Sequence, residues 1–261
     1  MIFPIGDDQV KGGYFPYVSY GFIALNILAY LYQMTAPNLM VCELGSIPND
    51  ILNGQNLHTL FTSMFMHGSI MHIIGNMLFL WIFADNIEAT VGSIPFLLFY
   101  LIGGLAASAL HIFLSDGIGM DLSACCNMCG NPPCLTQGSS VCPGSIPSVG
   151  ASGAIAAVLG AYLVMFPKSR VKLFVIYFFR AIYISAFWFL GFWILQQLYS
   201  GFSSFGPEAA ASGGTAWWAH IGGFIFGVVA GFFAKQGMDG PKGGMKPPEN
   251  EPDYSTKKGY V

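Results

Sequence analysis

Four polar side chains in apolar stretches of the sequence have types and spacings that suit acyl-transfer chemistry. Ser152 stands in the run Gly-Ala-Ser-Gly at residues 150–153, and His220 follows closely after two tryptophans. A serine hydroxyl becomes a nucleophile when a neighbouring imidazole takes its proton, and the imidazole can then protonate the leaving amine. His72 and Asn76 share one face of a helix and could donate hydrogen bonds to an oxyanion. The pattern predicts Ser152 as the nucleophile and His220 as the general base.

Because no acidic side chain within an apolar stretch stands ready to orient His220, we expect a Ser-His dyad rather than a triad. The backbone N–H of Ser152 would lie at a helix start, where it has no intrahelical partner, and is expected to join His72 and Asn76 as an oxyanion donor. A structural interpretation stays open beside this one. An intramembrane histidine can serve only to link helices, and a Gly-x-Ser-Gly run can serve only close packing.

The composition indicates an integral membrane protein. Only 23 of the 261 residues are charged, which is 9%, whereas soluble domains carry roughly 25%. Hydrophobic residues make up 54% of the chain, and the mean hydropathy is +0.59. This composition excludes disorder for most of the chain, and a net charge of −3 disfavours nucleic-acid binding.

Six segments are apolar enough to form membrane-spanning helices, each of which needs about 20 residues. We therefore expect an all-α integral membrane protein with a six-transmembrane-helix bundle. The second span is expected to end at Asp85 and Glu88, and the fifth to begin near Arg180 with residues 171–179 at the interface. The six segments are residues 17–34, 61–84, 94–114, 150–166, a part of 171–199, and 217–234.

The basic residues give the spans a direction. All ten precede the first span, lie between the fourth and fifth spans or just inside the fifth, or follow the sixth. The positive-inside rule then places both termini in the cytoplasm. The second, fourth and sixth spans therefore start at the outer side, which brings Ser152, His220, His72 and Asn76 to one depth. The ten are Lys11, Lys168, Arg170, Lys172, Arg180, Lys235, Lys242, Lys246, Lys257 and Lys258.

Small residues at every fourth position predict close contact between the fourth and sixth spans. This contact would bring Ser152 and His220 within reach of each other. The repeat includes Gly153, Ala157 and Ala161 in one segment, and Ala219, Gly223, Gly227 and Gly231 in the other.

These motifs resemble the rhomboid intramembrane serine proteases. The resemblance covers residues 14–234 and rests on the spacing His67-x4-His72-x3-Asn76, the run 150–153, and Ala219-His220-x-x-Gly223. The stretches 76–81 and 216–222 are similar to the common bacterial six-span branch, which implies a prokaryotic plasma membrane.

The resemblance implies a serine endopeptidase that cleaves single-span membrane proteins in or near their transmembrane segments, with the bilayer as its surroundings. It implies Ser152 as nucleophile, His220 as general base, and His72 with Asn76 as oxyanion donors, with no cofactor and no metal. Supporting roles are implied for His67, Gly150, Gly153 and Gly223. Substrate entry between the second and fifth spans is a further implication. The domain would run over residues 17–234, between a cytoplasmic segment 1–16 and a disordered cytoplasmic tail 235–261 rich in Gly, Pro and Lys.

Two positions depart from the family pattern. Many members carry Trp-Arg in the first outer loop, where this chain has His58-Thr59. Some members stack a Tyr on the catalytic His, where this chain has Ala156. We expect the first loop to be held in another way, and His220 to be oriented by another residue or by none.

A cysteine-rich outer loop, residues 116–149, is a larger departure. All six cysteines are predicted on the outer, oxidising side, where disulfides persist. We expect disulfides, with Cys42 joining the first outer loop to the third. The alternative is a metal site built on the spacing Cys126-x-x-Cys129. The six cysteines are Cys42, Cys125, Cys126, Cys129, Cys134 and Cys142.

Two other functions stay open. One is an inactive rhomboid-like protein that binds membrane clients, which the presence of both Ser152 and His220 disfavours. The other is a small transporter, which would predict paired charges or broken helices near the middle of the membrane.

Overall fold

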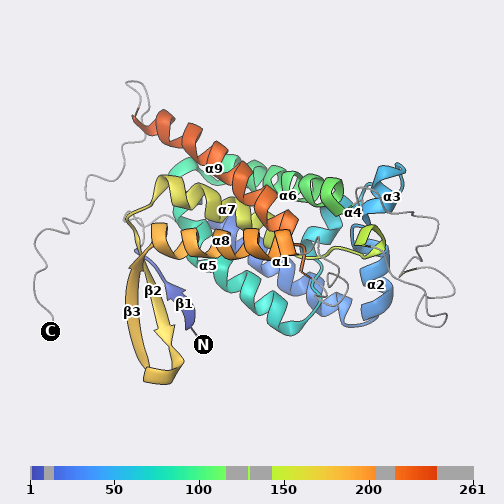
Figure 1. Ribbon diagram of the computed structural model, residues 1–261, viewed down its shortest axis with the longest axis horizontal. Helices are drawn as coiled ribbons and strands as arrows, with labels where there is room; N and C mark the ends of the chain where they lie inside the picture. The colour runs from blue at the N-terminus through green and yellow to red at the C-terminus, as the bar shows by residue number, and fades with distance from the viewer. Residues whose placement is uncertain (1, 9–14, 116–128, 130–142, 204–214, 240–261) are drawn as a thin grey trace, which may run out of the picture.

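The computed structural model describes residues 2–8, 15–115, 129, 143–203 and 215–239, and these residues are mostly helical (Figure 1). The long helices are α1 (Tyr17–Gln33), α5 (Ile70–Val91), α6 (Ser93–Ser115), α7 (Ser152–Met165), α8 (Ala186–Ser203) and α9 (Trp217–Asp239). The short elements before α5 are α2 (Pro37–Leu44), α3 (Pro48–Leu52), α4 (Thr59–Thr62) and the 3-10 turn η1 (Ser63–Phe65). The others are β1 (Ile2–Gly6), η4 (Pro143–Ser145), β2 (Arg170–Val175), η5 (Ile176–Phe178) and β3 (Arg180–Ser185).

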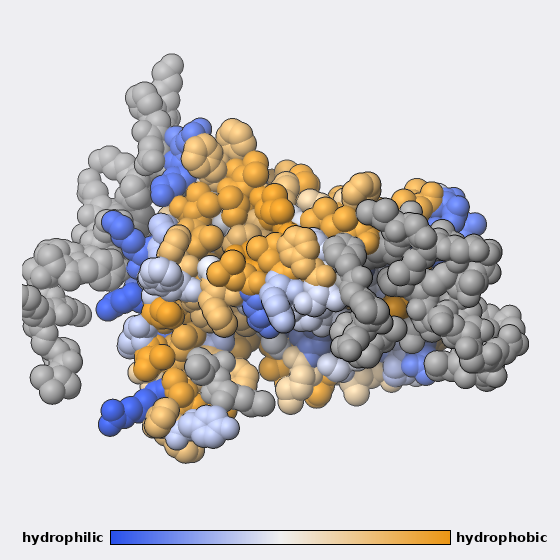
Figure 2. Space-filling view, in the orientation of Figure 1, coloured by the Kyte–Doolittle hydropathy of each residue, from blue (hydrophilic) through white to orange (hydrophobic). Residues whose placement is uncertain are grey.

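The long helices overlap all six segments that the sequence marks as apolar. Three stretches in the described part of the chain are long and apolar enough to cross a membrane: Ile70–Val91, Ser93–Leu114 and Trp217–Gln236. Apolar residues cover much of the face seen in Figure 2, and large hydrophobic side chains such as Phe232 and Phe233 are exposed. A protein with such a surface belongs in a membrane.

Helix α7 lies at the centre of the bundle and packs on α9 with almost no space between the backbones. A Cβ atom on Gly223 would lie 2.0 Å from the carbonyl oxygen of Gly153, and one on Gly227 would lie 1.9 Å from that of Ala157. The predicted contact between small-residue faces is confirmed. It fixes the first turn of α9 beside the first turn of α7.

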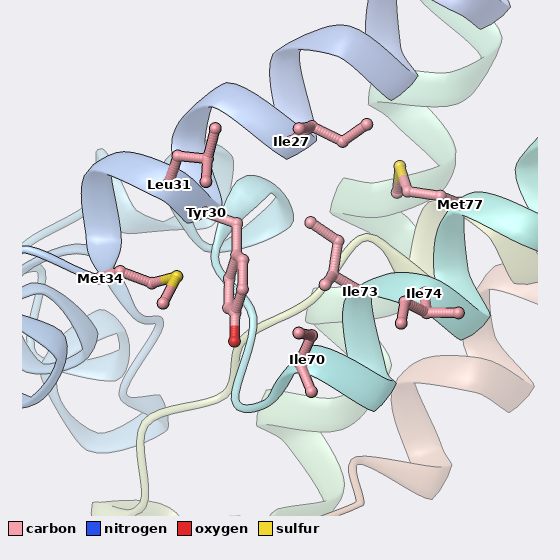
Figure 3. Close-up of a pocket in the computed structure, with 8 residues that line it drawn as sticks. All are labelled: Ile27, Tyr30, Leu31, Met34, Ile70, Ile73, Ile74 and Met77. Carbon is pink, nitrogen blue, oxygen red and sulfur yellow. The ribbon is translucent and has the colours of Figure 1, made fainter.

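An apolar groove of about 260 Å³ opens between α1 and α5 (Figure 3). Leu31 lines it from α1 and Met34 from the position just after that helix, and Ile70, Ile74 and Met77 line it from α5. Such a lining suits the hydrocarbon of a bilayer.

The second predicted span is shifted along the chain. Helix α5 begins at Ile70, where the side chain of Ser69 caps it, rather than at residue 61. It also continues through Asp85 and Glu88 to Val91. Glu88 is fully buried and accepts hydrogen bonds from the backbone of Val18 and from the backbone and hydroxyl of Ser19, as well as from Ser93. A carboxylate with so many donors can be buried inside a helix bundle, so this acidic residue does not mark a helix end.

The prediction that the fifth span begins near Arg180 is wrong. Residues 170–185 form a β-hairpin, and β1 adds a third antiparallel strand in the order β1-β2-β3. Val171 and Leu173 alternate with Arg170 and Lys172, so one face of β2 is buried and the other faces outward. Arg180 therefore lies in β3, and α8 begins only at Ala186. The sheet extends from one end of the bundle, across the direction of the long helices (Figure 1).

Helix α9 also runs beyond the predicted limit at Ala234, as far as Asp239. The Lys235 ammonium donates to the backbone oxygen of Val164 at 3.1 Å, which joins the ends of α9 and α7. Residues 240–261, the rest of the predicted tail, lie outside the described residues.

Candidate active site

Ser152 and His220 meet where α7 and α9 begin. The Nε2 atom of His220 lies 2.8 Å from the hydroxyl oxygen of Ser152, which is hydrogen-bonding distance. Serine near a helix start often caps it, but the cap residue of α7 is Ala151 and no side chain makes a capping hydrogen bond. The Ser152 hydroxyl is therefore committed to the imidazole and not to the helix end.

The other nitrogen of His220 is held by a residue that the sequence did not reveal. Oε1 of Gln197, on α8, lies 2.7 Å from Nδ1 of His220, and Gln197 is only 3% exposed. Trp193 stands one turn earlier on α8, with its ring centroid 5.9 Å from that of His220. Trp217 approaches the imidazole edge-on at 6.2 Å. The sequence shows Gln197 as a polar residue in an apolar segment. It does not show its partner, because His220 lies 23 residues further along the chain.

His67 holds the side chain of Asn76 in place through a hydrogen bond. Nδ1 of His67 lies 3.3 Å from the carbonyl oxygen of Phe65, so Nδ1 donates and Nε2 is left to accept. Nε2 lies 3.0 Å from the amide nitrogen of Asn76, which donates one of its two hydrogens. The His67 backbone is fixed in turn by Gln33, whose amide both donates to its oxygen and accepts from its N–H. Gln33 is a second residue that the sequence analysis missed.

His72 lies against Gly150, two residues before Ser152. A Cβ atom on Gly150 would lie 2.9 Å from Nε2 of His72 and 3.5 Å from the Ser152 hydroxyl oxygen. Gly150 also has φ +133°, which favours glycine. Gly150, Ser152 and Gly153 line a cavity of about 30 Å³, which is large enough for one water molecule. Gly150 thus lies between the His72 ring and the Ser152 hydroxyl, and the small cavity adjoins Ser152.

The Rhomboid domain family model matches residues 54–237, a range that includes Ser152, His220, His72 and Asn76. The chain belongs to the rhomboid family. It is also 33% identical over 125 residues to RHOMBOID-like protein 12, mitochondrial, from Arabidopsis thaliana. That match covers 48% of this chain and 34% of the plant protein, so it spans about a third of the plant protein's length.

The loop between α1 and α5 of this rhomboid protein is tied to the segment that precedes Ser152. Ser46 and Ser148 pair through two backbone hydrogen bonds of 3.0 and 2.8 Å. Asn49 donates to the hydroxyl of Ser145 at 3.2 Å. These contacts lie earlier in the loop than His58-Thr59, and they show one way in which the loop is held.

A disulfide adds a covalent tie. Cys42 in α2 is bonded to Cys129 in the cysteine-rich loop, which confirms the predicted link between the two loops. Cys129 is therefore not a free ligand for a metal site with Cys126, and the described residues hold no cluster of three or more metal-binding side chains. Cys125, Cys126, Cys134 and Cys142 lie outside the described residues.

Replacing Cys42 with serine is expected to destabilise the protein. A crosslink between residues 87 positions apart removes chain entropy worth roughly 4.6 kcal/mol from the unfolded state. Thermal unfolding in detergent should therefore begin at a lower temperature for Cys42→Ser. Cys129→Ser should have the same effect, and the double variant should be no worse than either single one. Peptide mapping without reductant that pairs Cys42 with a different cysteine would contradict the assignment.

Proposed function

We propose that this rhomboid protein is an intramembrane serine endopeptidase. The observation that carries the proposal is the 2.8 Å distance between the Ser152 hydroxyl oxygen and Nε2 of His220. In this mechanism Nε2 takes the hydroxyl proton while the oxygen attacks the scissile carbonyl carbon. The imidazolium then protonates the leaving amine, and the acyl-enzyme is hydrolysed when His220 activates a water in the same way.

The oxyanion that forms during attack needs donors placed in advance. We assign this role to the side chains of His72 and Asn76 and to the backbone N–H of Ser152, in the first turn of α7, which has no partner within the helix. His67 supports Asn76 through the 3.0 Å hydrogen bond, which leaves one N–H of the Asn76 amide for the substrate. No step requires a metal or a cofactor.

The proposed membrane arrangement has six crossings, with α1, α5, α6, α7, α8 and α9 as the spans. Both termini are assigned to the cytoplasm, in keeping with the positions of the ten basic residues. The Cys42–Cys129 disulfide supports this orientation because such bonds persist in oxidising compartments, and the loop it secures also pairs with Ser148, close before Ser152. The catalytic pair would then open to the outer side of a prokaryotic plasma membrane.

The hairpin at the opposite end of the bundle supports the same arrangement. Tyr177 and Phe178 at its tip are strongly exposed, and Lys172 and Arg180 stand on its strands. Exposed aromatic and basic side chains together suit the cytoplasmic surface of a bilayer. With this orientation, we assign as substrates single-span membrane proteins, which the protein would cleave near the outer surface of the membrane.

The test uses purified protein in liposomes with a tagged single-span test substrate. We expect cleavage near the outer end of the substrate helix, and covalent labelling of Ser152 by a serine-reactive fluorophosphonate probe. A metal chelator should leave the rate unchanged. Stable substrate binding with neither cleavage nor labelling would replace this proposal with the client-binding alternative.

A further inference from the structure

We propose that Gln197 is a positioning residue for the general base, selecting the one tautomer of His220 that can take the proton of Ser152. The inference rests on the proposed function, because it assigns a role to a residue that acts through His220. Family resemblance gave no candidate for this task, since the position of the stacking Tyr is Ala156 here.

The hydrogen bond between Gln197 and His220 has a defined direction. The Gln197 atom that faces Nδ1 of His220, at 2.7 Å, is the carbonyl oxygen Oε1. A carbonyl oxygen can only accept, so Nδ1 must carry the hydrogen. A neutral imidazole with its hydrogen on Nδ1 has its lone pair on Nε2, the atom that lies 2.8 Å from the Ser152 hydroxyl. The opposite tautomer would present an N–H to Ser152 and could not act as a base.

Gln197 is buried in an apolar part of the bundle. It is 3% exposed, whereas its neighbour Gln196 is exposed. A carboxamide in an apolar bundle is costly unless its polar atoms have partners, so its placement against His220 compensates for burial. The described residues show no Asp or Glu hydrogen-bonded to His220, so the carboxamide stands where a triad would have its carboxylate.

Helix α8 holds Gln197 against His220 through the residues on either side of it. Trp193, Gln197 and Gly201 recur at every fourth position and so lie on one face of the helix. Trp193 packs against the His220 ring, and a Cβ atom on Gly201 would lie 3.1 Å from Ile221. This face of α8 therefore contacts the start of α9 one turn before Gln197 and one turn after it. The imidazole of His220 is held between the Gln197 amide and the Ser152 hydroxyl.

The decisive variant is Gln197→Met, which keeps the length of the side chain and removes the acceptor. We expect kcat for cleavage to fall about 10- to 100-fold with KM nearly unchanged, because a base misplaced by about 1 Å can cost 100-fold. Gln197→Glu keeps an acceptor oxygen and should retain more of kcat than Gln197→Met. Gln196→Met, on the exposed side of the same helix, is the matched control and should cleave like the unaltered protein.

A spectroscopic readout separates positioning from mere stability. In protein labelled with ¹⁵N-histidine, the imidazole signals that vanish in His220→Ala belong to His220. They should report hydrogen on Nδ1 in the unaltered protein and a shift toward Nε2 in Gln197→Met. A variant that lowers the unfolding temperature but leaves tautomer and kcat unchanged would overturn the inference. Hydrogen on Nε2 in the unaltered protein would overturn it too, since the amide would then present its NH₂.

The two proposals fail in different ways. If the unaltered protein neither cleaves substrate nor reacts with the probe, the proposed function fails, while the histidine signals still decide whether Gln197 selects the tautomer. The other outcome is that cleavage depends on Ser152 while Gln197→Met and Gln196→Met have the same kcat and the same His220 tautomer. That result would support the protease function and refute the role of Gln197.

Discussion

Replacing Ser152 with alanine is expected to lower kcat for cleavage of a single-span substrate by about ten-thousand-fold or more, because the variant has no nucleophile. The fold should be unaffected. The Ser152 side chain makes no capping hydrogen bond in α7, and its hydrogen-bond partner is the imidazole of His220. Unfolding temperature in detergent is therefore expected to match that of the unaltered protein, while cleavage measured by gel shift disappears.

His220→Ala should cost about as much as Ser152→Ala, and the double variant should be no slower than either. Residues that act as one catalytic unit lose their benefit together, so their free-energy losses do not add. Ser203→Ala, which removes an exposed hydroxyl at the end of α8, is the control and should retain full activity. Cleavage that survives Ser152→Ala would show that another group is the nucleophile. Losses that multiply in the double variant would show that Ser152 and His220 act separately.

The sequence predicts well those features that involve polar residues in apolar segments, because burying a polar side chain in a membrane costs free energy. A histidine or asparagine in an apolar segment stands out because each needs a partner there, and Ser152 and His220 do meet. The glycine and alanine repeats were equally informative, since only small residues allow backbones as close as those of Gly227 and Ala157.

The hairpin could not be separated from a helix by its composition. Residues 171–185 are apolar and aromatic, and beside a long apolar stretch they fit either the start of a span or two short strands. A tertiary contact favours the strands: β1, which is distant in sequence at the N-terminus, pairs with β2 and supplies the third strand. A single sequence does not reveal that pairing.

The sequence does not predict the buried positions of Gln197 and Glu88, for a related reason. Each is polar within an apolar helix, but its meaning depends on partners distant in sequence: His220 for Gln197, and Val18 and Ser19 for Glu88. The sequence predicts that a span ends at Glu88, because an unpaired carboxylate is costly inside a membrane. Its hydrogen bonds to the start of α1 remove that cost.

Gly227→Ala is expected to be the most destabilising single-methyl change in the bundle. The added Cβ would lie 1.9 Å from the carbonyl oxygen of Ala157, and backbone on both sides leaves no flexible side chain to move away. Overpacking usually costs about 1–3 kcal/mol, and a clash between two backbones belongs at or above the upper end. The helices must separate, so thermal unfolding in detergent should begin well below that of the unaltered protein.

The same separation should reach the active site, because α7 carries Ser152 and α9 carries His220 in their first turns. Cleavage by the fraction that folds should therefore fall, even though Gly227 lies about two helical turns from His220. Gly21→Ala on α1 is the matched control, since a Cβ there meets nothing within 4 Å and alanine favours the helix. Equal unfolding temperatures for Gly227→Ala and Gly21→Ala would mean that α7 and α9 do not meet backbone to backbone. The spacing of the catalytic pair would then depend on contacts other than the glycine face.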